Sequence, residues 1–244
     1  SITWDANGGS GGLIASAAYG TTPTAPNVTK TGFSFAHWSP SVAPVTGDAV
    51  YTAQWTIKQY TVTFDSAGGS AVAAITQNYD TAVIAPVPPT KTGYTFTGWL
   101  PSVPATMPAT ATACVAQWTI NQYTVTFDSA GGSAVAAITL NYGTVITSPA
   151  PPVKTGYTFA GWLPAVPATM PAGGATCVAQ WTINQYTVTF DSAGGSAVTA
   201  ITQNYGTVIT VPAPPTKTGY TFAGWLPAVP ATMPATATTC VAQW

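Results

Sequence analysis

Charged side chains are scarce in this sequence, which contains five lysines and six aspartates but no arginine and no glutamate. They make up 5% of the 244 residues, whereas about 25% is usual for a soluble domain. The net charge of −1 excludes a nucleic-acid-binding protein, because neutralising phosphates requires clustered lysine and arginine. Intrinsic disorder is excluded too, since 46% of the residues are apolar.

Groups that could perform acid–base or metal chemistry are also rare. The single histidine, His37, has no nearby nucleophile and acid in the sequence of the kind that catalysis requires. The glycine-rich run 8–12 lacks the lysine and hydroxyl residue of a phosphate loop and predicts a turn. Each aspartate stands alone, whereas calcium requires several converging oxygens. We therefore expect no enzymatic activity, no cofactor and no metal site.

Long apolar runs are missing as well. Thr, Pro and Gly interrupt every stretch before the ~18 residues that a membrane span requires, so we expect no membrane span. The sequence begins with Ser1, not Met, and has no signal peptide, and we expect it to be a mature or excised piece of a protein.

Internal repetition is the strongest feature that is present. The run Tyr-Thr-Val-Thr-Phe-Asp begins at Tyr60, Tyr123 and Tyr186, which are 63 positions apart. Similarity at one constant period indicates tandem structural repeats. We predict four domains: a divergent repeat 1 at residues 1–55, repeat 2 at 56–118, repeat 3 at 119–181 and repeat 4 at 182–244.

Within a repeat, apolar and polar residues alternate with the period of two that is typical of β-strands. In repeat 3 this pattern predicts strands at 123–128, from 134 to about 142, at 157–162 and at 177–181. No segment carries a helical stripe, so we expect a mostly β fold with little or no helix.

Two further features of repeat 3 concern its turns and its third strand. The run 128–133 predicts a turn, because Asp bonds its own backbone and Gly adopts positive φ. The proline-rich segment 149–152 cannot lie inside a sheet and predicts a crossing segment, for which a helical turn before Lys154 is one option. Phe159 and Trp162 can both face inward only if a β-bulge at the glycine between them shifts the register.

Aromatic side chains are expected to form most of the core. A repeat of this size is marginally stable alone, and its other apolar residues are mostly small. We therefore expect few of its aromatic rings to be exposed to solvent. The expected core comprises Phe64, Trp99, Trp118, Phe127, Trp162, Trp181, Phe190, Trp225 and Trp244. The link 182–185 contains neither Gly nor Pro and allows little swivel, which predicts that the repeats are arranged end to end as a rod.

The three cysteines occupy one equivalent position, at Cys114, Cys177 and Cys240. No repeat contains two of them, which excludes a disulfide within a repeat. Two interpretations stay open: a buried thiol that acts as a small apolar side chain, and a thiol that forms a disulfide with another chain.

The repeated motifs resemble the internalin B-repeat (Listeria–Bacteroides repeat) family. The resemblance rests on Tyr-Thr-Val-Thr-Phe-Asp-Ser-Ala-Gly-Gly, on Ala-Gln-Trp, and on Lys-Thr-Gly-Tyr-Thr-Phe-x-Gly-Trp at 91–99, 154–162 and 217–225. It implies β-grasp-like modules that occur in tandem on secreted and surface-attached bacterial proteins, where they serve as stalks or in adhesion. It implies no enzymatic activity and no catalytic residues.

These features together lead us to expect an extracellular or cell-surface structural protein of a bacterium. Near-zero charge promotes association, so we expect self-association with other copies in a filament, sheath or matrix, with a passive stalk as the rival. The alternative is a carbohydrate-binding module that stacks exposed Trp162 and its equivalents on a sugar. Besides other copies of the chain, the expected partners are a surface glycan or a protein of a host or neighbouring cell.

Overall fold

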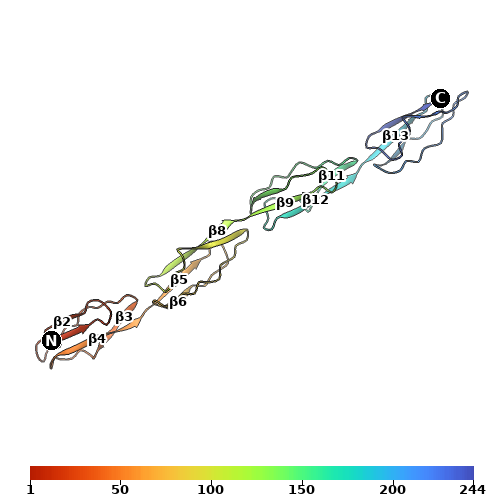
Figure 1. Ribbon diagram of the computed structural model, residues 1–244. Helices are drawn as coiled ribbons and strands as arrows, with labels where there is room; N and C mark the ends of the chain where they lie inside the picture. The colour runs from red at the N-terminus through yellow and green to blue at the C-terminus, as the bar shows by residue number, and fades with distance from the viewer. The chain divides into compact units, whose positions relative to one another are not determined.

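The computed structural model describes all 244 residues, and every regular element in it is a β-strand (Figure 1). Sixteen strands form four separate four-stranded sheets in tandem along the chain. The chain divides into two compact units, residues 1–120 and 121–244, and each unit contains two sheets. The structure includes no helix that could cross a membrane.

Unit 1 contains the first two sheets. The first comprises β1 (Ile2–Asp5), β2 (Leu13–Ala15), β3 (Phe33–Ser39) and β4 (Ala49–Ile57), in the order β2-β1-β4-β3. The second comprises β5 (Gln59–Asp65), β6 (Ile75–Asn78), β7 (Tyr94–Leu100) and β8 (Thr112–Ile120), in the order β6-β5-β8-β7. The two central strands of each sheet are parallel and the outer pairs are antiparallel.

Unit 2 repeats this arrangement. Its sheets comprise β9 (Gln122–Asp128), β10 (Ile138–Asn141), β11 (Tyr157–Leu163) and β12 (Ala175–Ile183), and then β13 (Gln185–Asp191), β14 (Ile201–Asn204), β15 (Gly224–Leu226) and β16 (Thr238–Gln243). The strand orders are β10-β9-β12-β11 and β14-β13-β16-β15. Only residue 184 separates β12 from β13, so the link between these sheets is shorter than the predicted 182–185.

The predicted bulge in the third strand is confirmed. The register of β11 against β12 shifts between Phe159 and Gly161, and Gly161 has a φ of 127°. This shift lets Phe159 and Trp162 contact each other at 5.3 Å between ring centroids, although their positions have opposite parity.

Two local predictions were wrong. The second strand of repeat 3 covers only residues 138–141, and the preceding residues 134–137 form no strand. No helical turn precedes Lys154. Instead the Lys154 carbonyl accepts a hydrogen bond from the Tyr157 amide at 3.1 Å, which closes a tight turn at Gly156 with a φ of 80°. The three-residue span of this turn leaves no room for a helical ladder.

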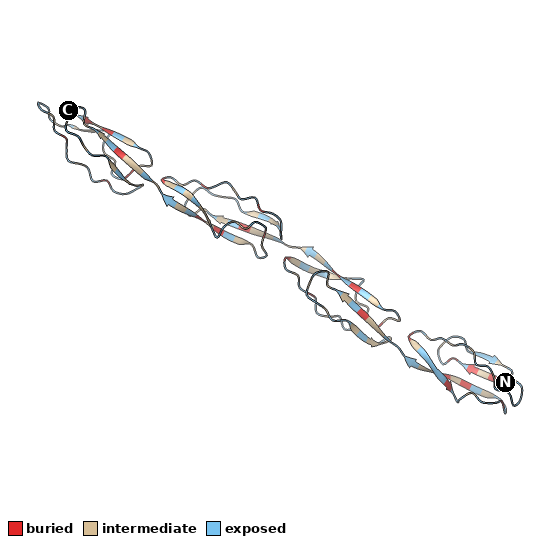
Figure 2. Ribbon diagram, turned by 180° about the vertical axis from the view of Figure 1, so that it is seen from behind, coloured by how far each residue is buried: buried red, intermediate tan, exposed pale blue.

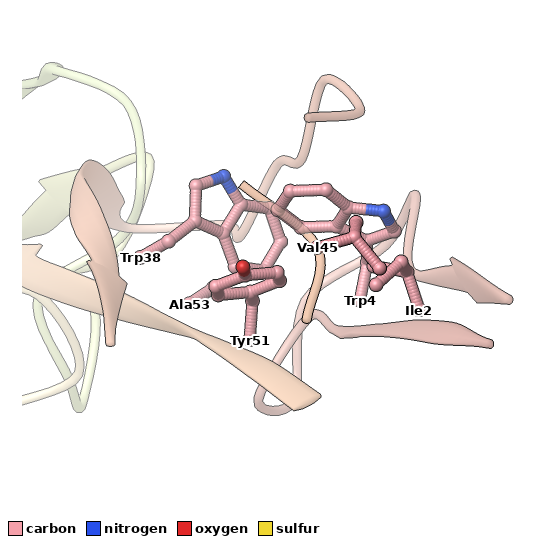
Figure 3. Close-up of a cluster of buried hydrophobic side chains, with 6 residues drawn as sticks. All are labelled: Ile2, Trp4, Trp38, Val45, Tyr51 and Ala53. Atoms are coloured by element: carbon pink, nitrogen blue, oxygen red, sulfur yellow. The ribbon is translucent and has the colours of Figure 1, made fainter. Parts of the chain in front are cut away.

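The fully buried residues lie at the centre of each sheet (Figure 2). In repeat 3, Val125, Met170 and Cys177 are 0% exposed, and partly buried aromatic rings pack around them. Repeat 1 fills the same region with larger side chains, where Trp4 stacks on Tyr51 at 4.8 Å between centroids (Figure 3). A module this small covers only the centre of its sheet, so only the side chains at that centre are fully enclosed.

The nine aromatic residues expected in the core are all half-buried: Phe64, Trp99, Trp118, Phe127, Trp162, Trp181, Phe190, Trp225 and Trp244. Their rings therefore surround the buried aliphatic and sulfur side chains, and Met107, Met170 and Met233 occupy central positions that the sequence analysis did not single out.

Candidate functional site

Each repeat carries a turn that is held in an unusual backbone conformation. In repeat 3, the turn 128–133 begins with Asp128, whose carboxylate accepts a hydrogen bond from the Ala130 amide at 2.8 Å. The Ser129 hydroxyl donates to the Gly132 carbonyl at 2.9 Å. Ala130 has a φ of 49°, in the left-handed region that a residue with a side chain seldom occupies. The predicted role of the aspartate in the turn is confirmed, whereas the positive φ of the alanine was not anticipated.

A lysine and a tryptophan from other parts of the repeat clamp this turn. Lys154 Nζ donates to the Ala130 carbonyl at 2.8 Å and lies 4.6 Å from the Tyr157 ring centroid. The Trp181 indole nitrogen donates to the Ser129 carbonyl at 2.9 Å, and its ring lies 5.7 Å from the same ammonium. A cation over aromatic faces contributes about 0.5–1 kcal/mol at an exposed site. The lysine thus joins the turn to the third strand.

The clamp recurs with nearly constant geometry. The lysine-to-carbonyl distance is 2.9 Å in repeat 2 and 2.8 Å in repeat 4, and repeat 1 has 3.0 Å with asparagine in place of alanine. The corresponding residues are Lys91, Ala67 and Trp118 in repeat 2, Lys217, Ala193 and Trp244 in repeat 4, and Lys30, Asn7 and Trp55 in repeat 1. The regular spacing of Lys and Trp in the sequence was the available signal for this clamp.

A shallow groove runs beside the clamp in repeats 3 and 4. In repeat 3 it has a volume of about 430 Å³ and in repeat 4 about 450 Å³. Its lining includes the clamp lysine and tryptophan together with the tyrosine and phenylalanine of the third strand: Lys154, Tyr157, Phe159 and Trp181 in repeat 3. The groove offers aromatic edges, hydroxyl groups and one ammonium, which are groups that can contact a polar ligand without charge pairing.

Unit 2 contains a second recurrent feature, the joint between repeats 3 and 4. The Tyr205 ring packs directly on Gly156, so closely that a Cβ on Gly156 would overlap with it, and it meets Tyr157 edge-to-face at 6.2 Å. The Asn184 amide donates to the Gly156 carbonyl at 2.9 Å, and the Tyr205 amide donates to the Asn184 carbonyl at 2.9 Å. The Thr158 hydroxyl adds a 2.6 Å hydrogen bond to the Asn184 side chain.

Unit 1 has the same joint between repeats 1 and 2. Tyr79 packs on Gly32 and lies 6.1 Å from the Phe33 ring, and the Lys58 amide donates to the Gly32 carbonyl at 2.8 Å. We call this arrangement the inter-repeat joint. It comprises Gly32, Phe33, Lys58 and Tyr79 in unit 1, and Gly156, Tyr157, Asn184 and Tyr205 in unit 2. The sequence analysis did not identify it, although the tyrosine and the glycine both recur at the repeat period.

The tryptophans proposed to stack on sugars occupy a different place. Trp162 is half-buried and packs against the core cluster of repeat 3, with the Phe127 ring 5.0 Å away. The tryptophan that lines the groove is Trp181, whose indole nitrogen already donates to the turn. His37 lies exposed on β3 opposite Gln54. No group of three His, Cys, Asp or Glu side chains is close enough to hold a metal ion.

The three thiols are unpaired and fully enclosed. Cys114, Cys177 and Cys240 are each 0% exposed, and no disulfide is present. Burial raises the pKa of all three thiols above the ordinary value of a cysteine. A disulfide with another chain would therefore require a repeat to open first.

This burial predicts that the native protein resists thiol reagents. We expect reaction with an aromatic disulfide reagent at pH 8 to be at least about 100-fold slower than in denaturant, because only opened molecules expose a thiolate. The thiol pKa is higher in the folded state than in the unfolded state. The free energy of unfolding therefore keeps its full value below about pH 9 and falls as the pH rises further and the thiols ionise. Rapid labelling of all three cysteines in native buffer would contradict the buried arrangement.

The sequence of this chain is similar to known repeat proteins. The model of the Listeria-Bacteroides repeat domain matches residues 1–57, 60–113, 123–167 and 186–241. A "Putative Gly-rich membrane protein" of Evansella cellulosilytica is 39% identical over 189 residues, which are 71% of this chain and 22% of that protein. Internalin H of Listeria monocytogenes serovar 1/2a is 36% identical over 143 residues, which are 51% of this chain and 25% of that protein.

Among solved structures, domains 3–4 of the Streptococcal High Identity Repeats in Tandem from a cell surface protein are 19% identical, with a TM-score of 0.20. The match covers 52% of this chain and 98% of that structure. The chain spans between 22% and 28% of the length of the curated relatives described above and of a second Evansella membrane protein. Since the family model matches a segment of each of the four repeats, the chain belongs to the Listeria-Bacteroides repeat domain family.

Proposed function

We propose that this chain is a non-enzymatic structural segment of a bacterial surface protein, built from β-grasp-like modules in a rod and able to associate with other copies. In this role the repeats provide an extended segment and contacts between copies, and the assembled copies are adhesive. The membership of the repeat family and the membrane-protein and internalin names of its relatives support a location at the cell surface.

The inter-repeat joint is the observation that carries this proposal. A strand ends and the next begins with one residue between them, and a tyrosine of the following repeat packs on a glycine of the preceding one. Such a joint resists bending, because bending would separate the ring from the glycine and break the Asn184-to-Gly156 hydrogen bond. A spacer that must transmit force or hold a fixed length requires joints that resist bending.

The uncharged exterior supports association between copies. Threonine hydroxyls form exposed cross-strand pairs, for example Thr124 with Thr139 at 2.7 Å and Thr126 with Thr176 at 2.9 Å. Apolar side chains such as Val145 in repeat 3 and Val208 in repeat 4 are also exposed to solvent. A surface with few charges provides little repulsion between copies.

Sedimentation velocity and electron microscopy of the purified chain at neutral pH test the proposal. We expect species larger than one chain that increase with concentration, and elongated particles. A chain that stays monomeric at all concentrations contradicts assembly and leaves the passive stalk. Small-angle scattering of that monomer tests the rod, because a globular particle of this length has a radius of gyration of roughly 18 Å and a rod a much larger one.

The recurrent groove favours one second candidate, carbohydrate binding. Its aromatic and hydroxyl lining at Tyr157, Phe159 and Trp181 is of the kind that contacts sugar rings. A glycan array with the labelled chain provides the test. Binding that is weakened in Tyr157→Ala, lost when Tyr220→Ala is added, and kept in Val145→Ala supports this candidate, and silence across the array removes it.

A further inference from the structure

The proline-rich crossing segments of repeats 2, 3 and 4 are buried with a period of three. In repeat 2, Val83, Pro86 and Pro89 are half-buried or buried, whereas the residues between them are exposed. Repeats 3 and 4 show the same order, which starts at the buried Ile146 and Ile209. Three residues per turn is the period of the polyproline II helix. Each crossing segment is therefore an extended ridge with one row of side chains toward the core and two rows outside.

One exposed row of the repeat 2 ridge carries two large apolar side chains. Ile84 and Val87 are three positions apart, so they lie on one side of the ridge, about 9 Å from each other. They are 83% and 85% exposed, the two highest values among the large apolar side chains of the chain. The equivalent residues are Thr147 and Ala150 in repeat 3, and Thr210 and Ala213 in repeat 4. Repeat 2 thus presents an apolar pair that the other ridges lack.

A carboxylate without a partner precedes this ridge. Asp80 is exposed, and its side chain forms no hydrogen bond or ion pair within the chain. Its φ is 62°, in the left-handed region, where repeats 3 and 4 have Gly143 and Gly206. A side chain kept at a position that glycine occupies without strain points to a role for that side chain. We infer that the charge of Asp80 belongs to the same exposed surface as the ridge.

The groove of repeat 3 has the chemistry that receives such a ridge. Its volume is about 430 Å³, and its lining includes Tyr157, Phe159 and Trp181 beside Lys154. Polyproline II segments dock in aromatic-lined grooves, because they are already extended and lose little conformational entropy on binding. The ammonium of Lys154 gives the groove a positive charge, which complements the carboxylate of Asp80.

We propose that the ridge of repeat 2, residues 83–89, docks with Ile84 and Val87 in the groove of repeat 3 of a second copy, or in the similar groove of repeat 4. The inference rests on the proposed association between copies, and it assigns the groove to that association instead of to a sugar. Repeats 2 and 3 each have a repeat before and after them in the sequence, so both surfaces lie inside the tandem array. The contact is heterologous, which leaves each docked copy with a further surface for another copy.

Replacements taken from the other repeats test the ridge. Ile84→Thr with Val87→Ala gives repeat 2 the residues that repeats 3 and 4 carry, so we expect this ridge variant to keep its fold. Sedimentation velocity of the whole chain measures association up to about 1 mM. Loss of the two apolar side chains should weaken association at least about 30-fold. Asp80→Asn should weaken it about threefold, and this difference from the wild type should vanish at high salt.

Two charge-matched variants test the groove. Thr155→Glu with Thr218→Glu places a carboxylate at each groove, where it obstructs the ridge and repels Asp80. Thr147→Glu with Thr210→Glu adds the same charge at exposed positions outside the grooves. We expect the groove variant to associate at least about tenfold more weakly than this control. Circular dichroism and thermal melting establish that each variant is folded.

A peptide locates the contact without altering the groove. An end-blocked peptide of residues 80–90 should shift the NMR signals of Tyr157 and Trp181 in the ridge variant, and in excess it should dissociate the wild-type oligomers. The equivalent peptide of residues 143–153 lacks the apolar pair and should do neither.

Two groups of results overturn the inference, and they differ in what they say of the proposed function. Wild-type oligomers that persist unchanged in the ridge variant, or that the peptide of residues 80–90 does not dissociate, show that copies associate through other surfaces. In that case the proposed association stands and this contact does not. A wild-type chain that is monomeric up to about 1 mM overturns both the contact and the association.

Discussion

Replacing Gly156 with alanine is expected to uncouple repeat 3 from repeat 4, whereas the same replacement at Gly219 leaves the chain coupled. Both glycines have a φ near 80° within an identical Lys-Thr-Gly-Tyr sequence, so the backbone strain of about 1 kcal/mol is shared. Only at Gly156 does the new methyl group overlap with a ring, that of Tyr205. We expect a further loss of about 2 kcal/mol at the joint, from aromatic contact and hydrogen bonding.

Hydrogen exchange on the full chain measures this difference. The Asn184 amide donates across the joint to Gly156, and the Tyr205 amide donates to Asn184 beside it, so the exchange of both should accelerate roughly 30-fold in Gly156→Ala, the factor that corresponds to about 2 kcal/mol. The two amides should exchange at the wild-type rate in Gly219→Ala. Equal acceleration in both variants would mean that the strain of the turn, not the ring on the glycine, accounts for the effect.

Replacing Met170 with alanine is expected to produce the largest loss of stability within a single repeat. Met170 is 0% exposed and packs with Val125 and Cys177 at the centre of the sheet. Removing a buried methionine side chain costs about 2–5 kcal/mol, because the site cannot fully collapse on the cavity. A repeat of this size has little stability in reserve, so repeat 3 should open at a lower denaturant concentration than the others.

The matched control is Val145→Ala. Val145 pairs with Thr169 beside Met170 but is 73% exposed, so its truncation should change the stability by less than about 0.5 kcal/mol. Exchange of peptides from β9 and β12 in increasing urea measures both variants. Neighbouring repeats stabilise each other through their interface, so β13 should lose some protection in Met170→Ala. A loss from Met170→Ala no greater than that of the control would contradict the central position of the methionine.

The local structure of each repeat was predictable because neighbouring residues decide it. Alternation with a period of two predicts strands, and the opposite parity of Phe159 and Trp162 predicts the bulge at Gly161 that the structure contains. Asp128 predicts the turn through a bond to an amide two residues away. The second strand was predicted too long, since alanines at 134 and 136 continue the alternation without side chains large enough to pack.

The sequence by itself determined the repeat organisation, through its period of 63 positions, and the β character and the turn at Asp128, because these two depend on residues within a few positions. Only the tertiary structure decided that Lys154 and Trp181 clamp the turn at Ala130, and that a ring of one repeat covers a glycine of the previous one. These contacts join residues that are 24 to 52 positions apart. Periodicity marks such residues as recurrent, but their partners depend on how the strands and crossing segments bring distant side chains together.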